Sequence, residues 1–268
     1  MTGQGDFAAH RRDGEHVIKV LHAQHSADTR FVAAALGAGK TGMDTYLSTL
    51  RAAGVTLPPD LSVVSTEPLA VRHRWVTGPI LLDCASAEPT RFVDAIVEIA
   101  RWVHALGDTD ARLDTNLANF CLADGRVVLV DVLPPLIPSV RPEPSNLFEV
   151  LFTALCFDTA VIHNALIGYA ARALLRSPAG VAARQRNDLA QQVPPEPAGP
   201  ADGASFPASW FRARVVLALH ALAGEVAPEV AHEFFDVTSV RVFRELPEAR
   251  RVLRIQQVDW TLKELALT

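Results

Sequence analysis

The clearest periodicity in the chain lies between residues 91 and 106. Apolar side chains recur there every three or four residues, and charged side chains occupy the opposite positions. This spacing matches the turn of an α-helix with one buried face. The pattern therefore predicts an amphipathic helix from Arg91 to Leu106, whose buried face consists of Phe92, Ile96, Ile99, Val103 and Leu106.

The first eighty residues mix strand and helix signals. The segment from Asp13 to Leu21 begins with a turn and continues as a β-branched run, which predicts a strand entered from a hairpin, with Lys19 in its middle. Apolar residues at helical spacing between Gly42 and Gly54 predict a helix that ends before Pro58 and whose apolar face consists of Met43, Tyr46, Leu47 and Leu50. Strand-like segments follow to about Thr77.

A second hairpin is predicted after residue 119. Two apolar runs flank the turn sequence Ala123-Asp-Gly125, a strong hairpin signal. A two-residue turn would point the side chains of Asn119 and Asp131 to opposite faces. We therefore expect a three-residue loop, Ala123–Gly125, that pairs Asn119 with Leu129 and brings Asp131 to the Asn119 face.

Beyond Pro144 the pattern is mainly helical. Residues 146–175 are almost continuously helix-forming, and helical spacing returns at residues 210–222 and 250–267. Residues 193–207 contain five prolines, which is typical of a loop. The predicted fold class is α+β, with a small β-rich N-terminal part and a larger helical C-terminal part that contains one isolated hairpin.

Composition narrows the range of partners. Of the 268 residues, 49% are hydrophobic and 21% are charged, as in a folded globular protein. Lys and Arg number 25 against 30 Asp and Glu, a net charge of −5, which argues against nucleic acid or a membrane surface as the partner. No clean apolar stretch reaches the roughly 20 residues of a membrane span. The three cysteines cannot form a complete disulfide set, and we expect a cytoplasmic protein.

Four side chains have the types and order that phosphoryl transfer requires. Asp114 precedes Asn119 by five residues, and Asp131 follows 17 residues after Asp114. Phosphoryl transfer needs a carboxylate at the attacking hydroxyl, oxygen ligands for Mg²⁺ and a cation at the nucleotide phosphates. Asp114 can supply the carboxylate and Lys19 the cation. Asn119 and Asp131 can supply the metal ligands.

In their order along the chain, these residues and their surroundings resemble the motifs of the aminoglycoside phosphotransferase and choline kinase-like family. The resemblance covers roughly residues 1–160. It includes a lysine strand, an acidic residue on the next helix, a hinge, the end of the helix before the catalytic loop, and the catalytic and magnesium residues. In this sequence these are Val17-Ile-Lys19-Val, Asp44, Trp75-Val76-Thr-Gly78, Trp102-Val-His104, Asp114, Asn119 and Asp131.

The resemblance implies a bilobal protein-kinase-like fold. A small, trimmed, nucleotide-binding N-lobe would occupy residues 1–78. A helical C-lobe would occupy residues 79–268 and carry the catalytic loop and the metal-binding hairpin. The implied cofactors are ATP and Mg²⁺, with Asp114 as the catalytic residue and Asn119 and Asp131 as metal ligands.

The resemblance also implies the nucleotide contacts. Lys19, steadied by Asp44, would bind the nucleotide phosphates, and the nucleotide would lie against Trp75 and Val76. The segment Gly3-Gln-Gly5 stands where a glycine-rich loop would cover the phosphates.

Three functions follow as alternatives. The first is an ATP- and Mg²⁺-dependent phosphotransferase acting on a hydroxyl of a small molecule, such as an aminoglycoside-like natural product. The second is a kinase of serine or threonine in a precursor peptide of lanthipeptide-type biosynthesis. The third is a pseudokinase that binds or scaffolds a partner protein, because Arg112-Leu113 stands where the family has His-Gly before the catalytic aspartate.

Overall fold

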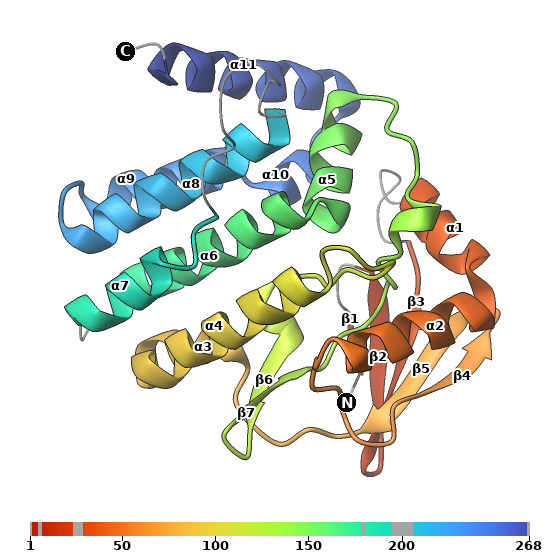
Figure 1. Cartoon of the computed structure of the whole chain (residues 1–268). Coiled ribbons are helices and arrows are strands. Elements are labelled where there is room, and N and C mark those ends of the chain that lie inside the picture. The colour runs from red at the N-terminus through yellow and green to blue at the C-terminus, as the bar shows by residue number, and fades with distance from the viewer. Residues whose placement is uncertain (1, 5–6, 24–28, 178–180, 195–205, 267–268) are drawn as a thin grey trace. The chain divides into compact units, whose positions relative to one another are not determined.

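The computed structural model describes residues 2–4, 7–23, 29–177, 181–194 and 206–266 (Figure 1). The chain forms two compact units: residues 1–82 with 101–142, and residues 83–100 with 143–268. This division differs from the expected boundary after residue 78, because residues 101–142 belong with the N-terminal sheet. The predicted α+β class is confirmed at the level of a small antiparallel N-terminal sheet and a larger, mostly helical part.

The first unit is built on a five-stranded antiparallel sheet in the order β1-β2-β3-β5-β4. Its central strand β3 confirms the predicted strand, and Lys19 lies in its middle, opposite His10 on β2 and Val71 on β5. The two-residue turn between β2 and β3 contains Gly14, whose φ of 61° suits glycine. The strands are β1 Thr2–Gln4, β2 Ala8–Asp13, β3 His16–Leu21, β4 Ser62–Thr66 and β5 Leu69–Arg74.

Two helices connect β3 to β4. They are α1 Thr29–Gly37 and α2 Gly39–Ala52, and α2 lies against β4 (Figure 1). Helix α2 confirms the helix predicted from residue 42, but it begins three residues earlier, at Gly39. Its buried side chains are the predicted apolar ones, Met43, Tyr46, Leu47 and Leu50.

The second hairpin has a tighter turn than expected. Strands β6 Phe120–Ala123 and β7 Arg126–Leu129 pair so that Ala123 lies opposite Arg126. The turn therefore has two residues, Asp124 and Gly125, with φ values of 49° and 76°. Two left-handed residues make the turn that best fits the twist of paired strands. The predicted three-residue loop is wrong, because Asp124 adopts the left-handed conformation as well as Gly125.

This hairpin is bonded to the N-terminal part of the first unit. The Leu122 N–H donates to the Pro79 carbonyl at 3.0 Å, and the Leu129 N–H donates to the Thr56 carbonyl at 2.9 Å. A Cβ atom on Gly78 would lie 2.1 Å from the Leu122 carbonyl oxygen, so this approach of two chain segments requires glycine. These contacts explain why the hairpin and the sheet belong to one unit.

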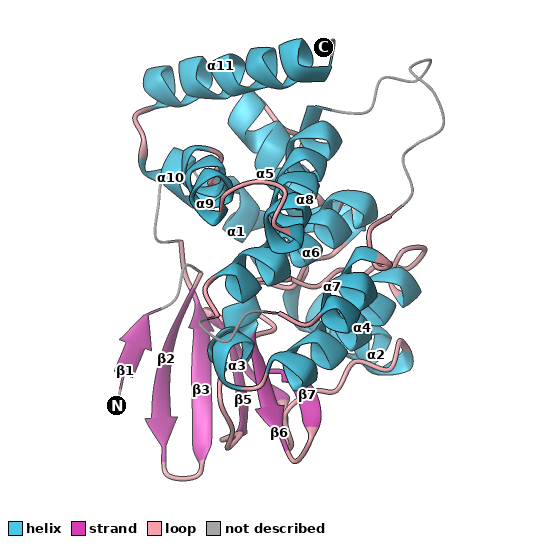
Figure 2. Cartoon of the chain, turned by 90° about the vertical axis from the view of Figure 1, so that its left-hand side faces the viewer, coloured by secondary structure: helices cyan, strands magenta, loops and turns pink. Residues whose placement is uncertain are grey.

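The regular structure described in the second unit is helical (Figure 2). Predicted helix 91–106 is confirmed as α4, and the helix-forming run 146–175 is divided at Asp158 into α5 and α6. The predicted segments 210–222 and 250–267 lie within α8 and α11, except that residue 267 is outside the described residues. Most of the expected loop 193–207, residues 195–205, is also outside them. The helices are α3 Leu81–Ala87, α4 Pro89–Ala105, α5 Leu147–Phe157, α6 Thr159–Leu175, α7 Ala183–Ala190, α8 Phe206–Ala223, α9 Pro228–Val237, α10 Val240–Glu245 and α11 Glu248–Ala266.

Helix α6 packs along α8, and α5 joins α6 at a bend of 84°. Within the described ranges, no single helix has the length and apolarity needed to cross a membrane. Of the helices that the structure describes, α5 and α6 reach that length and apolarity only when taken together across their bend.

Candidate active site

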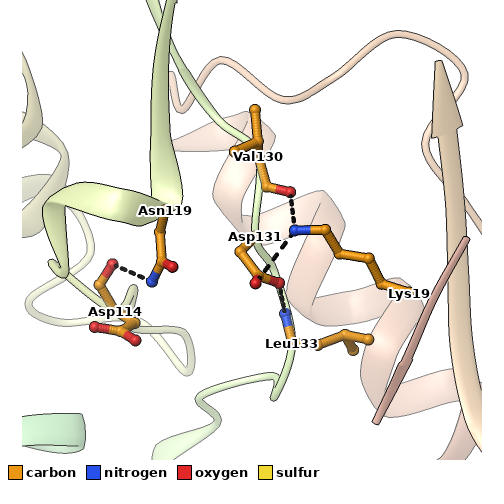
Figure 3. A network of polar contacts seen from close by, with 6 residues as sticks. All are labelled: Lys19, Asp114, Asn119, Val130, Asp131 and Leu133. Carbon is orange, nitrogen blue, oxygen red and sulfur yellow. Dashed lines mark hydrogen bonds and ion pairs between the residues drawn. The ribbon is translucent and has the colours of Figure 1, made fainter. Parts of the chain in front are cut away.

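An ion pair joins the N-terminal sheet to the segment after the second hairpin. The Lys19 ammonium on β3 lies 3.2 Å from Asp131 Oδ2 and donates to the Val130 carbonyl at 2.8 Å (Figure 3). Lys19 and Val130 are 111 residues apart in sequence. The lysine and aspartate side chains are 12% and 25% exposed, so the pair is screened less than one on the open surface. Folding thus brings together two residues that the sequence predicted for one site.

The Asp131 carboxylate has a second fixed contact. Its Oδ1 atom accepts the Leu133 N–H at 3.3 Å, so one oxygen faces Lys19 and the other the following backbone (Figure 3). The geometry holds a negative charge directly after β7.

The two-residue turn does not separate Asn119 from Asp131 as strand alternation would suggest. Strand β7 ends at Leu129, and Asn119 ends the short 3₁₀ helix η2, Leu117–Asn119, so neither residue occupies a strand position. The Val130 N–H donates to the Asn119 carbonyl at 2.8 Å, which places the two segments side by side. In Figure 3 the side chains of Asn119 and Asp131 extend to the same side of this junction.

Asp114 lies in a tight turn beside Asn119. Its Oδ1 accepts the Asn116 N–H at 2.9 Å, and the Asn119 side-chain amide donates to the Asp114 carbonyl at 3.5 Å (Figure 3). The Asp114 side chain is exposed, whereas its neighbours Leu113 and Thr115 are buried. The turn therefore presents a carboxylate outward from an anchored segment.

Arg112 anchors the segment that leads to Asp114. Its guanidinium is buried and donates to four backbone carbonyls at 2.6–2.8 Å. A guanidinium has five N–H donors, and backbone carbonyls at the end of a helix need such donors. Arg112 thereby joins the end of α4 to the turn before Asp114. The acceptors are the carbonyls of Leu106, Gly107, Thr109 and Ala111.

Tyr46 on α2 reaches the same segment. Its hydroxyl donates to the Arg112 carbonyl at 2.9 Å, and its ring is buried. Burial raises the pKa of the Tyr46 phenol, and the negative charges of Asp114 and Asp131 raise it further. The phenol therefore stays neutral and lies within electrostatic range of both carboxylates.

His73 on β5 is a buried titratable group on the Lys19 side of the sheet. It pairs with Val17, two residues before Lys19 on β3, and is 3% exposed. Its Nδ1 lies 2.8 Å from the Arg74 carbonyl, while Nε2 has no hydrogen-bond partner among the described residues. Burial lowers the pKa of His73, and the charge of Lys19 lowers it further although the Arg74 carbonyl opposes the shift. The imidazole is neutral at pH 7.

The expected pair between Lys19 and Asp44 is not formed. Asp44 pairs instead with Lys40, one turn earlier on α2, and both side chains are more than half exposed. The buried face of α2 holds Met43 and Tyr46, so Asp44 faces away from it. Asp131 takes the place at Lys19 that the sequence analysis gave to Asp44.

The other predicted nucleotide contacts are placed as follows. Trp75 directly follows β5, is 45% exposed and stacks under the Arg12 guanidinium at 4.7 Å. Val76 is partly exposed beside it. Gly3 lies on β1 opposite His10, whereas Gly5 is outside the described residues. Within the described part of the chain, no hydrogen bond or ion pair joins Trp75, Val76 or Gly3 to Lys19 or Asp131.

Sequence reasoning missed Arg112, Tyr46 and His73 as parts of this site. Tyr46 lies on the apolar face of a predicted helix, which indicates a core residue. Its hydroxyl is the one feature that indicates a polar contact as well. In the sequence, Arg112 departs from the His-Gly pattern. In the structure, its guanidinium supports the segment before Asp114 by donating to four backbone carbonyls.

The chain matches no protein-family model and has no significant match among curated proteins. A functional assignment therefore depends on the geometry of these residues.

Proposed function

We propose that this protein is an ATP- and Mg²⁺-dependent phosphotransferase with a kinase-like fold that phosphorylates a hydroxyl group of a small molecule. The observation that carries the proposal is the ion pair of Lys19 with Asp131, next to the turn that holds Asp114 and Asn119. A cation, two carboxylates and a carboxamide in this arrangement provide the groups that phosphoryl transfer uses.

In this proposal each side chain has one task. Lys19 binds the nucleotide phosphates, since a flexible ammonium on a strand can follow a phosphate oxygen. Asp114 orients the acceptor hydroxyl and accepts its proton, for which its outward position is suited. Asn119 and Asp131 hold magnesium, which supplies charge neutralisation at the phosphates when it is bound.

The donor set fits magnesium better than a transition metal. Asn119 and Asp131 offer oxygen atoms, and the described residues contain no group of three or more His, Cys, Asp or Glu side chains suited to a metal. Magnesium is commonly held by one or two protein oxygens together with water and phosphate oxygens. The two protein oxygens of Asn119 and Asp131 are therefore sufficient for a magnesium ion that is also bound to nucleotide phosphates.

The sheet supports the kinase-like part of the proposal. In protein kinases the phosphate-binding lysine lies on the third strand. Lys19 lies on β3, and a helix, α2, follows before β4. The three free cysteines, Cys84, Cys121 and Cys156, are buried, which fits the cytoplasmic location that an ATP-dependent enzyme would have.

A nucleotide-independent binding protein is the second candidate. It is favoured by one observation: both Asp131 oxygens already have partners, Lys19 and the Leu133 N–H. In a pseudokinase this pair would be a permanent structural contact, and the helical unit would serve a partner protein. In the enzyme, nucleotide phosphates would draw Lys19 toward them and release Asp131 for the metal.

The two candidates are separated by Mg²⁺-dependent release of phosphate from γ-labelled ATP, with water as the acceptor, followed by a screen of small-molecule alcohols and Ser/Thr peptides. Asp131→Asn keeps the shape of the side chain but removes its charge, and should lower turnover about a hundredfold or more. Asp236→Asn is the matched control, because Asp236 pairs with Arg172 in the second unit. Metal-dependent turnover that survives Asp131→Asn would sink the site assignment. No turnover in the wild type, with or without acceptors, would favour the binding protein.

A further inference from the structure

Tyr46 connects two chain segments that each carry a carboxylate of the candidate site. The first segment contains Arg112, two residues before Asp114, and the second contains Leu136, five residues after Asp131. The Tyr46 hydroxyl comes from α2, a third element. A contact of this kind fixes the two segments relative to each other.

Two hydrogen bonds link the Tyr46 hydroxyl, through Arg112, to the Leu136 segment. The Arg112 N–H donates to the Leu136 carbonyl at 2.8 Å, as in an isolated antiparallel bridge. The Tyr46 hydroxyl donates to the Arg112 carbonyl at 2.9 Å, so it binds one of the two bridged residues. The phenol thus satisfies the carbonyl of Arg112, whose N–H is bonded to the second segment.

The environment of this contact makes it rigid. Tyr46 is 2% exposed, Leu136 is 3% exposed and the Arg112 side chain is fixed by four carbonyls. A buried backbone group that loses its partner is costly, so the three residues keep one arrangement. Water has little access to replace the hydroxyl.

We propose that Tyr46 is a positioning residue that sets the separation of Asp114 and Asp131 by joining the Arg112 segment to the Leu136 segment. This inference rests on the proposed function above. The family resemblance gave α2 a different task, an acidic side chain for Lys19. In this chain the helix acts on the catalytic segment through a phenol, while Asp44 pairs with Lys40.

The variant that removes only the hydroxyl is Tyr46→Phe, and Tyr169→Phe in the second unit is its matched control. Hydrogen exchange should increase in residues 112–116 and 131–136 of Tyr46→Phe and in neither segment of Tyr169→Phe. The kcat for ATP turnover should fall about ten- to a hundredfold, as expected for a displacement of reacting groups by a fraction of an ångström to one ångström. The KM for ATP should stay within about twofold, because the phosphate-binding lysine is untouched.

The outcomes separate this inference from the proposed function. Increased exchange in both segments with a fall in kcat supports positioning. Increased exchange in Tyr46→Phe, together with no ATP turnover by the wild type, refutes the enzyme but leaves the structural link in place. Unchanged exchange, or a lower melting temperature with an unchanged kcat, overturns the inference. If Tyr46→Phe does not fold, exchange in the wild type decides, since the Arg112 amide, which donates to the Leu136 carbonyl, must then be among the slowest in the first unit; rapid exchange of this amide contradicts the link.

Discussion

Two buried arginines, one in each compact unit, are accommodated by opposite means. Arg112 in the first unit is 9% exposed and donates to four backbone carbonyls. Arg214 in the second unit is 3% exposed and lies over the rings of Phe211, Tyr169 and Phe235. Its Nε and Nη1 atoms have no hydrogen-bond partner among the described residues. Burial lowers the pKa of Arg214, although Tyr169 opposes the shift.

The contrast shows what distinguishes a positioning contact from a packing contact. Hydrogen bonds to carbonyls have fixed directions, so Arg112 determines the path of the chain before Asp114. Aromatic faces attract a cation over a broad area and set no single orientation. Arg112 therefore helps to define a site in the first unit, whereas Arg214 is packed into the helical core of the second unit.

The largest effect is expected from breaking the ion pair of the first unit. Lys19→Met should raise the KM for ATP and lower turnover about a hundredfold or more, because the phosphates lose their cation. It should also strengthen Mg²⁺ binding in the absence of nucleotide, since Asp131 is released. Arg172→Met, which breaks the pair with Asp236 in the second unit, should change neither quantity. Steady-state kinetics and calorimetric titration with Mg²⁺ measure both. Equal effects of Lys19→Met and Arg172→Met would contradict the claim that the ion pair of the first unit, and not that of the second, belongs to the site.

The second largest effect is expected on protein stability, where Arg112 and Arg214 should differ. Arg112→Met should destabilise the protein by about 2–4 kcal/mol, because buried carbonyls lose their donors. Arg214→Met should be neutral or stabilising by about 1 kcal/mol, because an apolar chain replaces a buried charge with unpartnered N–H groups. Urea denaturation of each variant against the wild type gives both values. A large loss of stability in Arg214→Met would show that its aromatic contacts outweigh its desolvation.

A smaller, pH-dependent effect is expected from His73. The pKa of His73 is lowered in the folded state, chiefly by burial, so the unfolded chain binds more protons once the pH drops toward 6.5. The stability contributed by neutral His73 is therefore present above pH 6.5 and declines as the pH falls toward the folded-state pKa. His73→Asn should flatten this decline in the free energy of unfolding. Urea denaturation between about pH 8 and pH 5, the range in which histidines usually titrate, measures it.

The second unit offers the comparison for this titration. His232 also has a lowered pKa, with burial as the first cause, followed by the charges of Arg176 and Arg172. It is partly exposed, whereas His73 is buried. His232→Asn should therefore flatten the decline less than His73→Asn does. The reverse order would mean that burial of His73 has little influence on its protonation.

The smallest effect is expected at the outer face of α2. Asp44 and Lys40 form an exposed pair one helical turn apart, and such pairs contribute less than about 0.5 kcal/mol. Asp44→Asn should leave the KM for ATP unchanged. A severalfold rise in that KM would instead support the Lys19 and Asp44 pairing that the sequence suggested.

Local signals in the sequence were sufficient for much of the fold. The strand around Lys19 is β-branched and follows a turn, and the helix at residues 91–106 has apolar side chains every three or four residues; both are confirmed. Helix α9, Pro228–Val237, was not predicted although it begins with a proline in its first turn. The break at Asp158 between α5 and α6 was also missed, because the apolar pattern continues across it.

The site was harder to predict because it depends on geometry beyond a strand or helix. The turn at Asp124 and Gly125 was judged by strand alternation, but that rule stops at Leu129, before Asp131. The partner of Lys19 was assigned from a helix position, whereas Asp44 lies on the exposed face of that helix. The four carbonyl contacts of Arg112 depend on how the chain turns after α4, which no pattern of residue types indicates.

The most direct test of the account is thermal unfolding of the wild type and of Asp131→Ala with ATP, each with and without Mg²⁺. A ligand at about 100 times its Kd stabilises the folded state by about 2.7 kcal/mol. The account predicts a Mg²⁺-dependent rise in the melting temperature of the wild type that is absent in Asp131→Ala. No rise in the wild type at millimolar ATP and Mg²⁺, or an equal rise in the variant, would contradict a metal-nucleotide site at Lys19 and Asp131.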